Sequence, residues 1–138
     1  MPLPPVLPGN TRGTVFRAIA ELRIADAATL LAAGRYNGAI YLAGYGIECH
    51  LKYGYCERKA ILRLPAKFET HSWDSLVKGA GLLANFKVAP GLLDLYSTLN
   101  DQWSPRLRYR TAPYREADAH RLYKEFIELY KFLRELIP

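Results

Sequence analysis

Three arginines alternate with other residues in a short stretch of the C-terminal third of the chain. Arg106, Arg108 and Arg110 are separated by a leucine and by Tyr109, and no acidic residue occurs between Arg106 and Arg115. In an extended backbone this alternation places the three guanidinium groups on one side. Guanidinium groups offer forked donors that match phosphate and carboxylate groups. The pattern predicts a phosphate-binding loop; the alternative is one arginine buried against a helix carboxylate and two solvated arginines.

Aromatic residues accompany these arginines. Trp103, Tyr109 and Tyr114 belong to the same stretch, and aromatic rings near basic groups are typical of surfaces that stack on nucleic-acid bases. The chain of 138 residues has a net charge of +6 and a pI of about 9.4, which favours a polyanionic partner. We therefore expect Arg106, Arg108, Tyr109 and Arg110 to contact nucleotide phosphates.

A second group lies in the most apolar stretch of the chain. Glu48 and Lys52 stand four residues apart, so a helix places them side by side. If the pair is exposed, it is an ordinary helix-stabilising ion pair. If it is buried, Glu48 needs a partner, which Lys52 or an arginine of the loop can supply. A structural ion-pair network is favoured over catalysis, and Glu48, Lys52, His71 and Trp103 are expected to shape a cleft.

The histidines and cysteines indicate neither a metal site nor a disulfide. His50, His71 and His120 show no metal-ligand spacing, and no sequence pattern for a cofactor occurs, so no metal and no cofactor are expected. Cys49 and Cys56 lie two helical turns, about 10 Å, apart, which is too far for a disulfide. Two reduced thiols, no signal peptide and no run of ~18 apolar residues predict a cytoplasmic protein without membrane contact.

The rest of the chain supplies helices that position these groups. Apolar residues recur at helical spacing in three long and two short stretches, separated by prolines or glycines. The predicted helices cover residues 12–32, 36–60, 71–80, 90–100 and 115–136. A proline-rich arm, residues 1–11, precedes them, and residues 101–114 are predicted to form an ordered loop.

This pattern predicts one all-α domain, residues 12–138, with the architecture of an up-and-down bundle of four to five helices. Thr70 is the expected N-cap of the third helix, which places His71 in the first turn of that helix. Pro90 is expected to be the first residue of the fourth helix.

Residues 35–55, RYNGAIYLAGYGIECHLKYGY, are similar to the A-Y-Y-L-A-G-Y-x-x-E-x-x-L-K signature of one branch of HEPN domains (higher eukaryotes and prokaryotes nucleotide-binding). His71, and then the loop from Trp103 to Tyr109 before a long last helix, also resemble that family. The resemblance covers most of the chain. It implies a HEPN-like bundle, often homodimeric, that acts beside a small nucleotidyltransferase partner in prokaryotic toxin–antitoxin or defence systems.

Some HEPN proteins are metal-independent ribonucleases with an R-x(4-6)-H motif near the start of the last helix. Arg115 and His120 fit that spacing. The resemblance then implies that His120 is the acid–base group and that Arg115 binds the scissile phosphate. Within one ideal helix the two side chains diverge by about 140°. They converge only if the helix begins after Arg115, or if a dimer mate supplies one of them.

Three functions follow from these observations. The first is a HEPN-like module that binds a nucleotide or RNA through its arginine loop, or that acts as an adaptor for an acidic partner. The second is a metal-independent endoribonuclease that uses Arg115 and His120. The third is a helical protein that binds another protein and whose arginines serve only the fold.

Overall fold

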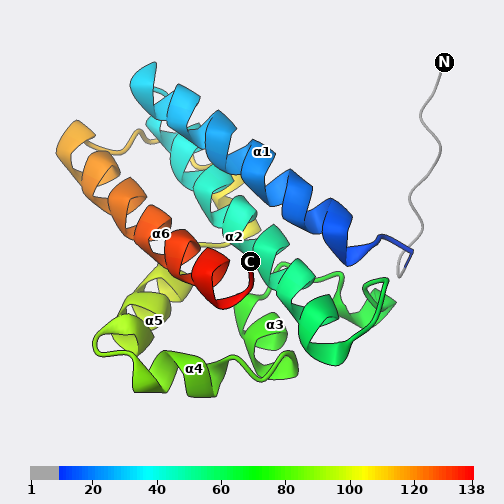
Figure 1. Ribbon diagram of the computed structural model, residues 1–138. Coiled ribbons are helices and arrows are strands. Elements are labelled where there is room, and N and C mark those ends of the chain that lie inside the picture. Colours follow the sequence, from blue (N-terminus) through cyan, green and yellow to red (C-terminus); the bar gives the residue numbers. More distant parts are fainter. Residues whose placement is uncertain (1–9) are drawn as a thin grey trace, which may run out of the picture.

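The computed structural model describes residues 10–138, so most of the arm predicted for residues 1–11 lies outside the described part of the chain. The described residues form helices and no strand; their only β-type contact is an isolated bridge between Arg12 and Arg63. The elements in chain order are α1 (Gly13–Ala32), α2 (Tyr36–Lys59), η1 (Ala66–Phe68), α3 (Trp73–Gly79), α4 (Leu83–Val88), α5 (Leu92–Gln102), η2 (Pro105–Tyr109) and α6 (Glu116–Leu136) (Figure 1).

The helices α1 and α2 form an antiparallel hairpin. A tight turn joins them, and Gly34 has a φ of 75° there, a conformation that favours glycine. Small residues line the contact between the two helices. Ala20 and Ala27 are fully buried, and a methyl group at Gly46 would lie 2.8 Å from Ile24 of α1. The close approach explains why α2 tolerates a glycine at position 46, where it costs helix stability.

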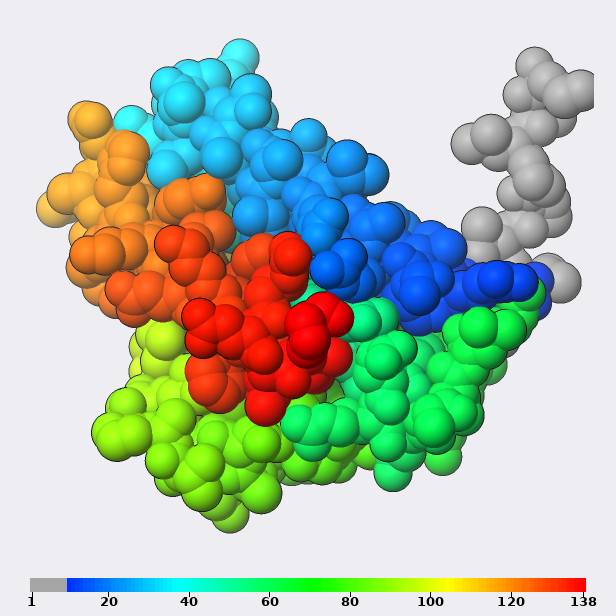
Figure 2. All heavy atoms as spheres, viewed as in Figure 1, coloured from blue at the N-terminus to red at the C-terminus, as the bar shows by residue number. Residues whose placement is uncertain are grey.

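The helix α2 is the centre of the bundle, as its apolar sequence predicts. Every residue from Gly46 to Cys56 is buried, on all sides of the helix. The helices α1 and α6 lie along α2, and α3 packs at its C-terminal half (Figure 1). In the space-filling view the surfaces of α1 and α6 meet over α2 and hide most of its middle (Figure 2).

The helix α6 runs parallel to α2. Tyr36 at the start of α2 packs against His120 at the start of α6, and a methyl group at Gly54 would lie 2.5 Å from Ile137. The α1–α2 hairpin is antiparallel, as an up-and-down bundle requires, whereas the prediction did not fix the direction of α6 relative to α2. The parallel direction results from the connection, residues 60–115, whose short helices carry the chain back to the N-terminal end of α2.

The other differences between the observed and the predicted helices also lie in this connection. The short helix α4 was not predicted, and the bundle has six α helices in residues 10–138 rather than four or five. The helix α3 begins later than predicted, because Ser72 and not Thr70 is its N-cap and accepts a hydrogen bond from the Ser75 amide at 3.2 Å. Residue 71 therefore precedes the helix. Likewise, α5 begins after a Gly91 N-cap, so that Pro90 lies outside it.

Candidate functional site

Glu48 is fully buried and holds two basic side chains. Its Oε2 accepts a hydrogen bond from Lys52 Nζ at 2.9 Å, and its Oε1 accepts one from His71 Nδ1 at 2.9 Å. We call these three residues the Glu48 cluster. The burial and the Lys52 partner agree with the sequence analysis. The second partner is His71, and no arginine of residues 10–138 bonds to Glu48.

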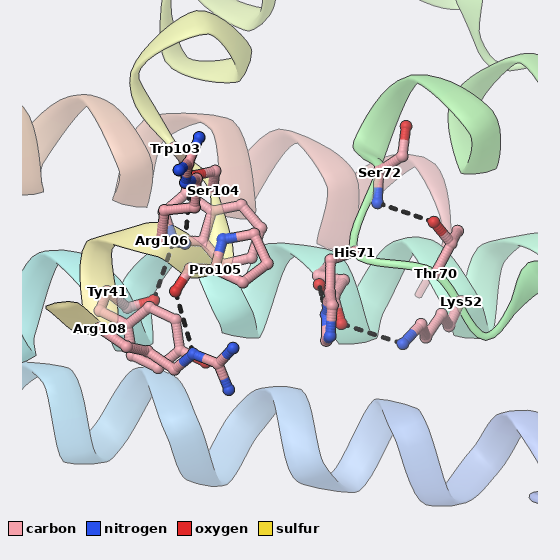
Figure 3. Close-up of polar contacts among 11 residues, drawn as sticks. Tyr41, Lys52, Thr70, His71, Ser72, Trp103, Ser104, Pro105, Arg106 and Arg108 are labelled. Carbon is pink, nitrogen blue, oxygen red and sulfur yellow. Dashed lines mark hydrogen bonds and ion pairs between the residues drawn. The ribbon is translucent and has the colours of Figure 1, made fainter.

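Local structure explains how these side chains meet. Glu48 and Lys52 share one face of α2 because they are four residues apart. His71 comes from the loop before α3, where Thr70 Oγ1 accepts a hydrogen bond from the Ser72 amide at 3.1 Å (Figure 3). The turn at residues 70–72, and not a helix, aims the imidazole at Glu48. The prediction that His71 lies in the first turn of the third helix is therefore wrong.

One ring nitrogen of His71 is left for other partners. Since a carboxylate only accepts hydrogen bonds, His71 Nδ1 carries a hydrogen and donates the hydrogen bond to Glu48, and Nε2 is the remaining polar atom of the ring. The side chain is 55% exposed and borders a hollow of about 370 Å³, which we call the His71 hollow. The hollow is lined by Thr11, Val15, Phe16, Ile19, Lys52, Glu69 and His71. An imidazole fixed by a buried carboxylate can exchange a hydrogen bond or a proton with a ligand there.

Arg106 and Arg108 stand on a 3₁₀ turn, η2, and Arg110 is its C-cap with an extended backbone. Pro105 starts the turn, and the Ser104 hydroxyl accepts the Arg106 amide proton at 3.2 Å. The prediction that alternation aligns the guanidinium groups on one side is therefore wrong, since side chains two apart diverge on a 3₁₀ helix. We call residues 105–110 the arginine turn.

The arginine turn leaves its cationic groups in solvent. Arg106, Arg108 and Arg110 are all exposed, and none forms an ion pair within residues 10–138. Arg108 donates from Nε to the Pro105 carbonyl at 3.0 Å, and its guanidinium lies 5.4 Å from the Tyr109 ring centre. Tyr109 itself is 76% exposed. The alternative in which one arginine is buried against a helix carboxylate is not what the structure shows.

Trp103 anchors the arginine turn to α2. It is buried, stacks between Trp73 and Tyr41 with ring centres 5.4 and 6.0 Å away, and donates from Nε1 to the Tyr41 carbonyl at 3.1 Å. Its ring covers Gly44, where any side chain would collide with it. Trp103 therefore shapes this region. Because its ring is buried, it cannot stack on a base, which its position in the sequence had suggested.

Asn37 is a second anchor that the sequence analysis missed. Its Nδ2 donates to the carbonyls of Arg110 and Ala112 at 3.2 and 3.1 Å, and its Oδ1 accepts the amide proton of Tyr114 at 3.1 Å. One side chain of α2 thus satisfies three backbone groups of residues 110–114, at the end of the arginine turn and directly after it. A lone asparagine in the first turn of a helix gives no sequence signal of such a role. The Arg110 guanidinium lies 4.0 Å from the Tyr114 ring centre.

The arginine turn and the Glu48 cluster lie along the same side of α2 (Figure 3). Tyr41, beside the arginine turn, and Glu48 are seven residues apart, or about 10 Å along a helix. Burial raises the pKa of Tyr41, the charge of Arg108 opposes that effect, and the charge of Glu48 adds to it. Tyr41 is therefore placed within the electrostatic reach of both groups. A smaller hollow of about 250 Å³ lies between Asn37, Tyr41 and Arg108.

Arg115 and His120 lie at the start of α6. The helix begins at Glu116, and Arg115 is its N-cap with an extended backbone, which meets one of the two conditions for convergence. His120 is exposed and packs edge-on against Tyr36, with ring centres 5.7 Å apart. No hydrogen bond within residues 10–138 orients its ring.

The third histidine and the cysteines belong to the core. His50 donates from Nε2 to the carbonyls of Leu133 and Ile137 at 3.2 and 2.8 Å, and burial lowers its pKa. Cys49 and Cys56 are free and buried, and burial raises the pKa of the Cys49 thiol to about 12. A group with that pKa is a poor nucleophile near neutral pH.

Within residues 10–138, no three histidine, cysteine or acidic side chains are grouped so as to hold a metal ion. The same residues contain no helix with the length and apolar character required to cross a bilayer. Comparison of the chain with protein-family models, curated proteins and solved structures found no match.

Proposed function

We propose that this protein is a HEPN-like module that binds RNA or a nucleotide through the phosphate groups. The observation that carries the proposal is the arginine turn. Arg106, Arg108 and Arg110 are exposed, lack acidic partners in the described chain, and stand on a backbone that Trp103 and Asn37 fix to α2. A fixed backbone lowers the entropic cost of ordering these groups around a ligand.

The three guanidinium groups have no carboxylate partner within residues 10–138 and can bind the phosphate groups of a ligand. Each guanidinium offers several donors to phosphate oxygens, and the exposed Tyr109 ring can stack on a base beside them. The resemblance to HEPN domains adds a homodimer, a nucleotidyltransferase partner and a prokaryotic toxin–antitoxin or defence system to the proposal. The two free, buried thiols suit the cytoplasm.

Replacing the three arginines tests the proposal. The triple variant Arg106→Ala, Arg108→Ala, Arg110→Ala is expected to bind single-stranded RNA at least about tenfold more weakly, a loss of ~1.4 kcal/mol. Because each lost phosphate contact reduces counterion release, the slope of log K against log salt should fall in magnitude by about 2. Fluorescence anisotropy of a labelled oligonucleotide over a series of salt concentrations measures both quantities.

A charge-matched control separates the arginine turn from the overall charge. Lys59, Lys78 and Lys87 are exposed and lie away from the turn on α2, α3 and α4, so their triple alanine variant loses the same charge. It should retain the affinity of the wild type to within about twofold, because net charge acts only at long range and is screened. Equal losses in the two triple variants would contradict a phosphate site at the arginine turn.

The alternative function is a metal-independent endoribonuclease that uses Arg115 and His120. The start of α6 at Glu116 favours this alternative, because Arg115 then lies outside the helix and its side chain need not diverge from that of His120. The same purified protein decides between the two functions. RNA cleavage that persists in EDTA and is lost in both Arg115→Ala and His120→Ala would replace simple binding with catalysis. Retention of intact RNA supports the binding module.

A further inference from the structure

We propose that the His71 hollow is the subsite for a nucleobase of the same RNA strand whose phosphates contact the arginine turn. The inference rests on the proposed function and specifies which part of the ligand occupies which part of the site. Four observations carry it: the charge balance of the hollow, its lining, the orientation of His71, and its position along α2.

The charge balance excludes phosphate from the hollow and favours an uncharged group. The ammonium of Lys52 is already neutralised by Glu48 at 2.9 Å, and Glu69 adds a negative charge to the lining. The arginine turn, by contrast, carries three cations without acidic partners in residues 10–138. A polyanion is therefore drawn to the arginine turn, and only its neutral parts are compatible with the hollow.

The lining matches a flat group with apolar faces and polar edges. Val15, Phe16 and Ile19 of α1 form an apolar wall, whereas Thr11, Glu69 and His71 bring polar atoms to the same hollow. Its volume of about 370 Å³ lies within the range of ~300–1,000 Å³ that is usual for small-ligand pockets. A nucleobase, which stacks by its faces and forms hydrogen bonds at its edges, has this combination.

His71 is fixed so that it can recognise such an edge. Its Nδ1 donates to the buried Glu48, and this selects the tautomer in which Nε2, the other ring nitrogen, is the acceptor. The Glu69 carboxylate is a second acceptor at the hollow. Two acceptors suit a base that carries an exocyclic amino group, such as adenine.

The position of the hollow allows one strand to occupy both parts of the site. The Glu48 cluster and the arginine turn lie on the same side of α2 (Figure 3). Tyr41, beside the arginine turn, and Lys52, in the lining of the hollow, are about 16 Å apart along the helix. The rings of Tyr41 and Tyr45 stack between the cluster and the turn with centres 6.2 Å apart and remain partly exposed. A single strand that follows α2 can therefore place phosphates at Arg108 and a nearby base beside His71.

Two probes separate the base subsite from the phosphate site. One is an oligoadenylate, and the other is a ribose–phosphate oligomer of equal length without bases. The wild type should bind the oligoadenylate about tenfold more tightly. The variant Val15→Trp fills the hollow with an indole and should reduce this preference severalfold, to the share that stacking on Tyr109 contributes, while binding the abasic oligomer as the wild type does. Because Val15 is 43% exposed, the added bulk does not enter the core.

The control is Leu22→Trp on the same helix. Leu22 is 58% exposed and lies two turns from Val15, outside the lining of the hollow, so this variant should keep the tenfold preference. Equal binding of both probes by the wild type, or an unchanged preference in Val15→Trp, would overturn the base subsite and leave the phosphate site standing. Failure of the wild type to bind either probe would overturn the phosphate site and the base subsite together.

Discussion

Glu48→Ala is expected to lower the free energy of unfolding by about 3–5 kcal/mol, because it strands a buried cation. Lys52 is 7% exposed, its ammonium lies 5.4 Å from the Phe16 ring centre, and Glu48 is its acidic partner. Without Glu48 the ammonium loses that charge while remaining out of water. Since small domains are stable by only about 5–15 kcal/mol, the variant should lose much of its resistance to urea. Urea denaturation followed by circular dichroism at neutral pH measures the effect.

A double variant identifies the cause of this loss. Glu48→Leu with Lys52→Met removes both charges and keeps apolar volume, so it should regain most of the stability that Glu48→Ala loses. If the loss came from the cavity alone, Glu48→Leu by itself would already regain the stability, and adding Lys52→Met would bring no further gain. A cost below about 1 kcal/mol in Glu48→Ala would mean that Lys52 reaches water, against its burial in the structure.

Trp103→Ala is expected to destabilise the protein by a similar amount, about 3–5 kcal/mol. The variant removes a buried indole that packs on Trp73 and Tyr41, and it leaves the surface of Gly44 uncovered. It also removes the donor to the Tyr41 carbonyl. Because the same side chain anchors the arginine turn, RNA binding should weaken even under conditions in which the variant is folded. Urea denaturation and RNA anisotropy at low temperature report the two losses separately.

Trp103→Phe is the matched comparison. A phenyl ring keeps most of the stacking on Trp73 but cannot donate to Tyr41, so it should lose less stability than the alanine variant and more than a surface change. Weakened RNA binding in the folded Trp103→Ala protein would support a role in positioning the arginines. Unchanged binding would show that Asn37 alone holds the turn.

The long helices could be predicted because their sequences repeat one signal many times. The stripe of Leu122, Phe126, Leu129 and Leu133 fixes α6, and the largely apolar sequence of residues 35–55 indicates that α2 lies in the centre. The six residues of α4 are too short for a period to appear. The direction of α6 relative to α2 could not be predicted either, because it depends on the geometry of a connection made of several short pieces.

The part of the site that could be predicted is the ion pair whose two residues belong to the same helix. Glu48 and Lys52 are four residues apart, and burial of that stretch implies an ion pair. His71 and Asn37 make contacts 23 and more than 70 positions away in sequence, which no local pattern encodes. The arginine alternation was misleading for another reason. It fits a strand, but Pro105 and the Ser104 cap favour a 3₁₀ turn there.

The parallel pairing of α2 and α6 also constrains the order of folding. The contact between His50 and Leu133 closes a loop of 83 positions, whereas α1 and α2 meet across a short turn and His71 reaches Glu48 over 23 positions. Long loops cost more entropy to close, and distant contacts slow folding. We therefore expect the hairpin and the Glu48 cluster to form first and α6 to dock last. In pulse-labelling hydrogen exchange, α2 should gain protection before α6, and the reverse order would contradict this sequence of events.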